Sequence, residues 1–160
     1  MSNLSPIFQH GLLYGVVLSF FMTVAILGSL YANTEIWLDD YPPDVRAKFG
    51  PMSAKTKRQR IWFGIPVFLI SFGLIVWSIV QLKAVNGGSL NFGVVFLSTW
   101  LMLMIFNLVD LVIIDWLILM WLRPPFAILP GTEGMAGYQD YGLPLRGFIK
   151  GSVGILIASL

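Results

Sequence analysis

Three polar side chains that could carry charge or bind a cation interrupt a long apolar run. They are Asn107, Asp110 and Asp115, and no Lys or Arg occurs between Leu90 and Leu122. An acidic side chain inside a membrane segment is costly, so such residues usually mark an ion pathway or pair with a cation. Asn107 and Asp110 are three positions apart and share one face of an α-helix, which indicates a proton or cation site.

The alternative interpretation is an ion pair at the inner membrane boundary. A helix beginning near residue 90 reaches Asp110 after roughly 30 Å and Asp115 after about 38 Å, and the hydrocarbon core is about 30 Å thick. An α-helix points these two acids about 140° apart, so we do not expect them to share a site. Arg123, Arg146 and Lys150 are the basic partners expected on the same side. We favour the ion pair for both aspartates.

Two further motifs have types and spacing that could do chemistry. His10 is the only histidine, and an imidazole in a membrane helix can bind a haem or pigment metal. Without a second ligand we expect an interfacial polar residue instead. The segment DDYPPD (39–44) resembles the aspartate clusters with which prenyl-transferring enzymes hold magnesium diphosphate. Two prolines interrupt it and no second acidic cluster follows, so we interpret it as a turn before a helix that begins at Asp44.

The segment KTKRQR (55–60) has four basic residues at one end of an apolar block. They are Lys55, Lys57, Arg58 and Arg60. Such a patch attracts anionic lipid headgroups by about 1 kcal/mol per residue, and it is too short and too poor in aromatic residues for nucleic acid.

The chain has no cysteine and no motif for nucleotide, zinc, covalent haem or nucleophilic catalysis. We therefore predict no catalytic residue, metal or cofactor, and we expect bound lipids.

Four apolar blocks must position these residues. Of the 160 residues 57% are hydrophobic and only 11% are charged, whereas soluble domains have about 25% charged residues. About 20 apolar residues cross a membrane as a helix. The sequence predicts an all-α integral membrane four-helix bundle that forms a single domain over 1–160. The predicted spans are 11–32, 61–82, 91–115 with a helical extension to 122, and 143–160, and the loops are 33–60 and 123–142.

Orientation follows from the basic residues. All of the 10 Lys and Arg residues except Lys83 lie in or beside the two longer loops. Basic residues concentrate on the cytoplasmic side of a membrane. We expect both loops in the cytoplasm, both termini outside, and the third helix extending past the inner interface. The expected location is the plasma (inner) membrane of a prokaryote.

Small residues recur every four positions in the first and fourth blocks. Gly11, Gly15 and Ser19 form one ridge, and Gly147 and Gly151 form a second. Membrane helices associate closely where small residues let their backbones approach. These ridges predict a contact between the first and fourth spans or with a second protein. The alternative, which we favour, is ordinary packing within the chain.

These observations favour a non-catalytic accessory or scaffold subunit of a larger membrane complex. Its expected partners are lipids and other integral membrane subunits, with no nucleic acid. One alternative is a small proton- or cation-linked transporter or channel that uses Asn107 and Asp110. A second alternative is a lipid-modifying enzyme with its site at the inner interface.

Overall fold

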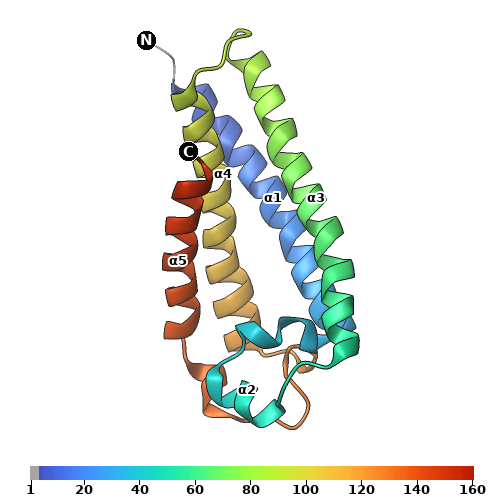
Figure 1. Cartoon of the computed structure of the whole chain (residues 1–160). Helices are drawn as coiled ribbons and strands as arrows, with labels where there is room; N and C mark the ends of the chain where they lie inside the picture. Colours follow the sequence, from blue (N-terminus) through green and yellow to red (C-terminus); the bar gives the residue numbers. More distant parts are fainter. Residues whose placement is uncertain (1–3) are drawn as a thin grey trace.

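The computed structural model describes residues 4–160, so the single domain predicted over 1–160 is described from residue 4 onward. Every regular element of these residues is helical, as predicted (Figure 1). In chain order the elements are α1 (Leu4–Ala32), η1 (Thr34–Asp40), α2 (Pro43–Phe49), α3 (Ala54–Val85), α4 (Phe92–Val109), η2 (Asp110–Leu122), η3 (Pro125–Ala127), η4 (Ala136–Gln139) and α5 (Gly142–Ala158).

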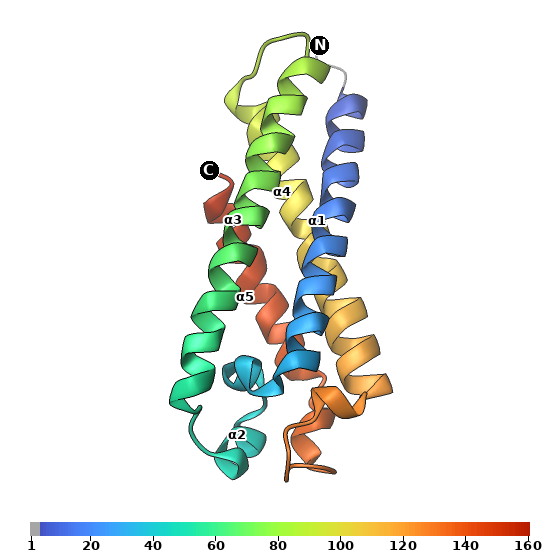
Figure 2. The same cartoon turned by 90° about the vertical axis from the view of Figure 1, so that its right-hand side faces the viewer.

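Three helical stretches are long and apolar enough to cross a membrane. They are Ser5–Ala32 in α1, Ala54–Ala84 in α3, and Phe92–Leu122, which joins α4 to η2. The predicted fourth span is a helix as expected, but α5 has only 17 residues and includes Arg146 and Lys150. It ends partway along the bundle, below the level of the N-terminal end of α1 (Figures 1 and 2). The described residues thus give three candidate spans and a shorter fourth helix.

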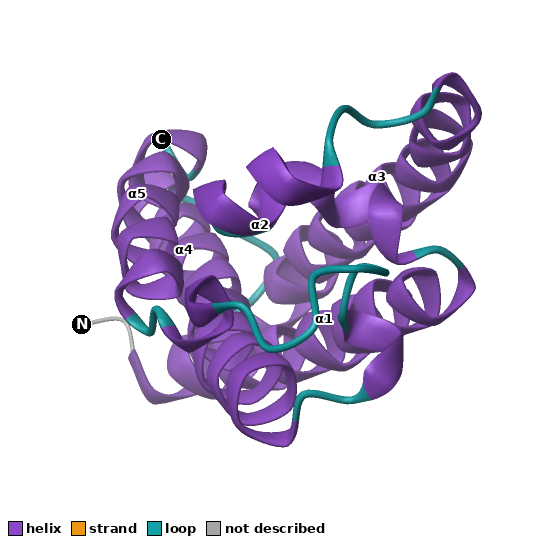
Figure 3. Ribbon diagram, turned by 90° about the horizontal axis from the view of Figure 1, so that it is seen from below, coloured by secondary structure: helices purple, strands orange, loops and turns teal. Residues whose placement is uncertain are grey.

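Helix α1 lies between α3 and α4, and α5 packs against the far side of α4 and against η2 (Figure 3). The contact of α1 with α4 is close because Gly11 and Gly15 have no side chain. A Cβ atom on Gly15 would lie 2.7 Å from the side chain of Ile105, and one on Gly11 would lie 3.0 Å from Leu101. Gly11 and Gly15 of the first ridge therefore join α1 to α4, which is packing within the chain, and they do not form the alternative contact with the fourth helix.

The two longer loops fold together into a small unit, which we call the cap (residues 33–53 and 123–141), at one end of the bundle (Figure 1). Its core contains Leu38, Val45, Leu129 and Tyr138. The Tyr41 hydroxyl crosses between the loops and donates to the carbonyl of Ala127 at 2.7 Å. Because these contacts bury apolar side chains from both loops, the cap is an ordered part of the fold.

Glu35 fixes the cap to the start of α3. Its carboxylate accepts from the backbone N–H of Ser53 at 2.5 Å and from the Thr56 hydroxyl at 2.6 Å. Ser53 is also the N-cap of α3, since its hydroxyl accepts from the Thr56 N–H. Burial raises the pKa of Glu35, but these hydrogen bonds outweigh burial and leave the pKa below its usual value.

Candidate functional site

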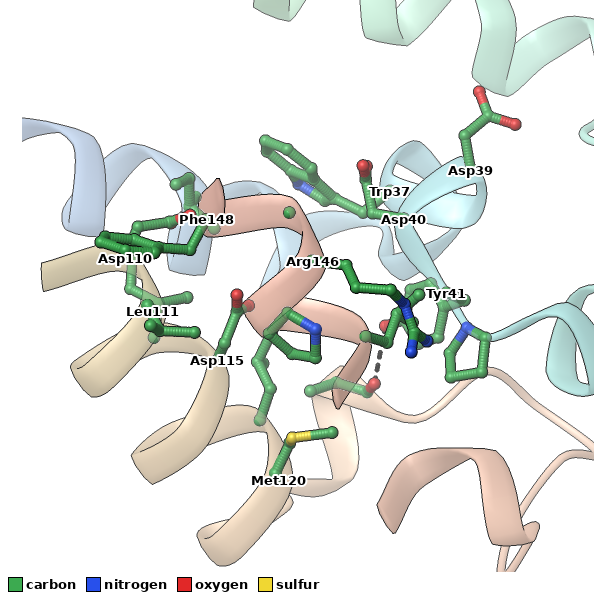
Figure 4. Close-up of a pocket in the computed structure, with 18 of the residues that line it drawn as sticks. Trp37, Asp39, Asp40, Tyr41, Asp110, Leu111, Asp115, Met120, Arg146 and Phe148 are labelled. Atoms are coloured by element: carbon green, nitrogen blue, oxygen red, sulfur yellow. Dashed lines mark hydrogen bonds between the residues drawn. The ribbon is translucent and has the colours of Figure 1, made fainter. Parts of the chain in front are cut away.

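A cavity of about 480 Å³ lies where α1, η2 and α5 meet the cap (Figure 4). Its lining combines charged side chains with apolar ones. The charged members are Asp39, Asp40, Arg46, Asp110, Asp115, Arg146 and Lys150. The apolar members include Ile26 and Leu30 from α1, Leu111 and Ile114 from η2, and Phe148 from α5. A cavity of this size can hold a small molecule or the polar end of a larger one.

Asp110 and Asp115 both line this cavity, although an α-helix would point them apart. The reason is that η2 is a π-helix, in which each N–H bonds to the carbonyl five residues earlier. The last of these bonds runs from the N–H of Arg123 to the carbonyl of Ile118 at 2.9 Å. Residues five apart therefore come to the same face of η2, and the predicted separation of the two acids is wrong. The sequence could not predict the shared face, because no residue pattern in this apolar stretch marks a π-helix.

The expected ion pairs of these acids are not the ones that form. Arg146 pairs with Asp140 at 3.1 Å instead. Arg123 has a positive φ of 42°, and its guanidinium donates to the carbonyl of Met120 at 2.6 Å. Over residues 4–160, neither Asp110 nor Asp115 belongs to an ion pair.

Asn107 binds α5 and is not paired with Asp110. Its side-chain amide donates to the carbonyl of Phe148 at 3.1 Å and to the hydroxyl of Ser152 at 3.0 Å. Gly151 leaves the space for this amide, whereas Gly147, the other member of the second ridge, has no atom within 4 Å of an added Cβ. Asn107 therefore serves mainly as a polar contact between α4 and α5, at the end of the cavity farther from the cap.

The cap contributes charged groups that the sequence interpretation assigned only to a turn. Asp40 and Arg46 line the cavity from η1 and α2, and Asp39 pairs with Arg60. Burial raises the pKa of the Asp40 carboxyl, and the positive charge of Arg60 lowers it to a smaller extent. Burial also raises the pKa of Tyr41, so this hydroxyl stays neutral and can donate its hydrogen bond. The DDYPPD segment was the sequence signal for these acidic groups. Only the folded cap, however, brings the segment to the cavity beside η2.

The remaining candidates lie away from the cavity. His10 is buried between α1 and α3, where its Nε2 lies 2.9 Å from the carbonyl of Ser78 and 3.1 Å from its hydroxyl. Its ring also stacks at a tilt on Tyr14. Within the described chain no group of three His, Asp or Glu side chains could hold a metal ion. The basic residues at the N-terminal end of α3 are exposed: Lys55, Lys57, Arg58 and Arg60.

The fold and the cavity define a helical protein with three apolar helices that could span a membrane and a charged cavity beside its cap. Comparison with protein-family models, with curated proteins and with solved structures finds no match.

Proposed function

We propose that this is a multi-pass membrane protein whose cavity binds the polar end of an amphiphile at the cytoplasmic interface. The long helices cross the bilayer, α5 enters it from the cap, and the cap lies in the cytoplasm. The basic residues at the N-terminal end of α3, and Arg146 and Lys150 of α5, support this orientation. The reason is that basic residues favour the cytoplasmic side. The expected location is still the plasma membrane of a prokaryote.

The observation that carries the proposal is that one cavity combines unpaired charges with membrane-level apolar walls. Asp110 and Asp115 provide carboxyl groups on η2, while Leu111 and Ile114 on the same helix provide apolar surface. A fully soluble ligand would make no use of the apolar walls, and a hydrocarbon would leave the charged groups without a polar partner. An amphiphile matches both.

Passage of a proton or cation has less support. The half of the bundle far from the cap contains a packed cluster of Ile7, Leu82 and Val94, and Met102 of α4 is also buried. Asn107, which a conduit would use, is occupied by its contacts with α5. A lipid-modifying enzyme would use this same cavity. Its test is whether the Asp110→Asn variant loses turnover of a lipid substrate.

Filling the cavity tests the proposal. Gly147 lines it and has open space around an added Cβ, so Gly147→Trp fills the cavity without a clash at the backbone. Gly154→Trp is the matched control, because Gly154 lies on the same helix, also has open space, and is not part of the lining. The probes are lipids with zwitterionic, anionic and cationic headgroups, each carrying a fluorophore on its chain, added to the purified protein in a neutral detergent.

We expect at least one probe to bind saturably, and Gly147→Trp to weaken its binding about tenfold or more, which corresponds to about 1.4 kcal/mol. Gly154→Trp should bind like the parent protein. Equal binding by parent and Gly147→Trp for every probe would refute the proposed function.

A separate observation favours the accessory-subunit role as a second candidate. Helix α3 contacts mainly α1, and most of its aromatic side chains are exposed: Trp62 is 73%, Phe68 66% and Trp77 55% exposed. Purification in a mild detergent should then yield a complex larger than this chain. Trp62→Ser together with Phe68→Ser should release the partner, while Ile157→Ser on α5 should not. A single chain of unchanged mass in all preparations contradicts this role.

A further inference from the structure

The cavity is lined by charged groups of both signs, and only Arg46 and Arg60 act on one of its acids, Asp40, strongly enough to lower the pKa of that carboxyl against the larger effect of burial. Arg146 and Asp39 are occupied by Asp140 and Arg60. The other charged lining groups are Asp40, Asp110, Asp115, Arg46 and Lys150. Within residues 4–160 none of these five groups belongs to an ion pair, although all face one cavity.

The opposite charges come from different elements, which keeps them apart. Asp110 and Asp115 belong to η2, Lys150 belongs to α5 and Arg46 belongs to α2. Figure 4 shows Asp110 and Asp115 on η2, with Arg146 of α5 extending away from them toward Tyr41 of the cap. The η2 wall of the cavity is therefore acidic and α5 contributes Lys150, while the cap contributes both signs, with Asp40 on η1 and Arg46 on α2.

The level of each group along the bundle follows from two contacts between the antiparallel helices. Asn107 is level with Phe148 and Ser152, and the Trp116 indole lies 3.4 Å from the carbonyl of Tyr141. The segment from Asp110 to Asp115 therefore lies between these levels, beside the first two turns of α5. Lys150 is at the end of this interval farther from the cap, and the cap with Arg46 closes the other end.

Asp110 and Asp115 are half-buried, whereas Arg46 and Lys150 are exposed. A partly buried charge without a partner is costly, and the cost falls when an opposite charge and hydrogen bonds are supplied. Here a ligand can supply both signs at once. A protonated amine would meet the carboxyl groups of η2. The long side chains of Lys150 and Arg46 would reach a phosphate from the two ends of the cavity, and a guanidinium matches phosphate oxygens in two-pronged hydrogen bonds.

We propose that the ligand is a zwitterionic amphiphile that carries a phosphate and a primary or quaternary amine. This inference rests on the proposed function and names the ligand class of the same cavity. Its amine faces Asp110 and Asp115, its phosphate faces Arg46 and Lys150, and its chain leaves along Ile26 and Leu30 of α1 and Phe148 of α5. An exclusively anionic ligand leaves the η2 acids unpaired, and an exclusively cationic one leaves the basic groups unpaired.

Competition among three chain-labelled probes tests this ligand class. The probes are phosphatidylethanolamine, which has both charges, phosphatidylglycerol, which lacks the amine, and a long-chain alkylamine, which lacks the phosphate. Binding is measured by fluorescence anisotropy to the full chain in a neutral maltoside detergent at pH 7. Soluble phosphoethanolamine, which has the headgroup but no chain, is the fourth arm.

We expect phosphatidylethanolamine to bind about tenfold or more tightly than either singly charged probe. Asp110→Asn with Asp115→Asn should remove its advantage over phosphatidylglycerol. Arg46→Gln with Lys150→Gln should remove its advantage over the alkylamine. Phosphoethanolamine should compete at least about tenfold more weakly than the lipid, because it lacks the chain.

The outcomes separate this inference from the proposed function. If phosphatidylglycerol or the alkylamine binds as tightly as phosphatidylethanolamine to the parent protein, and Gly147→Trp still blocks binding, the zwitterion is overturned and the amphiphile site stands. If phosphoethanolamine competes as well as the lipid, the ligand is a soluble phosphate amine and the amphiphile is overturned. These comparisons use the parent protein, so they hold even where a charge variant fails to fold.

Discussion

The side-chain oxygen of Asn107 lies 2.9 Å from the position that a Cβ atom on Gly151 would take. The amide nitrogen of the same side chain donates to α5 at Phe148 and Ser152. Glycine and asparagine therefore act as one unit: the missing side chain on α5 admits the amide from α4. This pair fixes the wall of the cavity that carries Lys150.

The first prediction concerns this pair. Gly151→Val should push α5 away from α4, because the new side chain overlaps the Asn107 amide, and overpacking of this kind costs about 1–3 kcal/mol. Thermal unfolding in detergent should show the loss of stability, and Gly147→Val and Gly154→Val are controls with open space. If Gly151→Val unfolds like the two controls, the close approach of these helices is not what holds α5.

The second prediction concerns the α1–α4 contact. Gly15→Ala places a Cβ atom 2.7 Å from the Ile105 side chain and should destabilise the protein by about 1–3 kcal/mol. Gly28→Ala, on the same helix with nothing within 4 Å, should leave stability unchanged or raise it slightly. Ile105→Ala combined with Gly15→Ala should recover part of the loss, and additive losses in the double variant would contradict this packing.

The third prediction tests the π-helix. Because Asp110 and Asp115 share the cavity, Asp110→Cys and Asp115→Cys should both react with a hydrophilic thiol reagent. The chain has no cysteine of its own, so there is no background reaction. Ile113→Cys, at a position exposed on the outside of the same helix, should be embedded in detergent or lipid and react about tenfold more slowly. Reaction at only one of the two aspartate positions would indicate α-helical geometry.

The fourth prediction concerns Glu35. Glu35→Gln should weaken the attachment of the cap to α3 and lower stability by about 1–2 kcal/mol, because charge-assisted bonds to Ser53 and Thr56 are lost. The folded state depresses the pKa of Glu35, so its contribution is fully present above the usual pKa of 4.5 and is lost as the pH falls through the depressed value. Unfolding measured between pH 7 and pH 3 should therefore show less acid dependence in Glu35→Gln. Equal acid dependence in both proteins would exclude this role.

The sequence alone predicted the all-helical class and the long apolar helices. Hydrophobicity adds up residue by residue, so the apolar blocks were visible without any contact being known. The capping residue Ser53 and the end of α2 at Gly50 are equally local features. The acids of η2 were also singled out from sequence, because a carboxyl group in an apolar run is rare.

Tertiary structure decided the composition of the site. The π-helix turned Asp115 to the same face as Asp110, and the folded cap brought Asp40 and Arg46 to the cavity. Gly15 packs against Ile105, although its sequence pattern names no partner. The physical reason is that the neighbours of a helix and the walls of a cavity come from groups far apart in the sequence, whose relative placement exists only once the chain has folded.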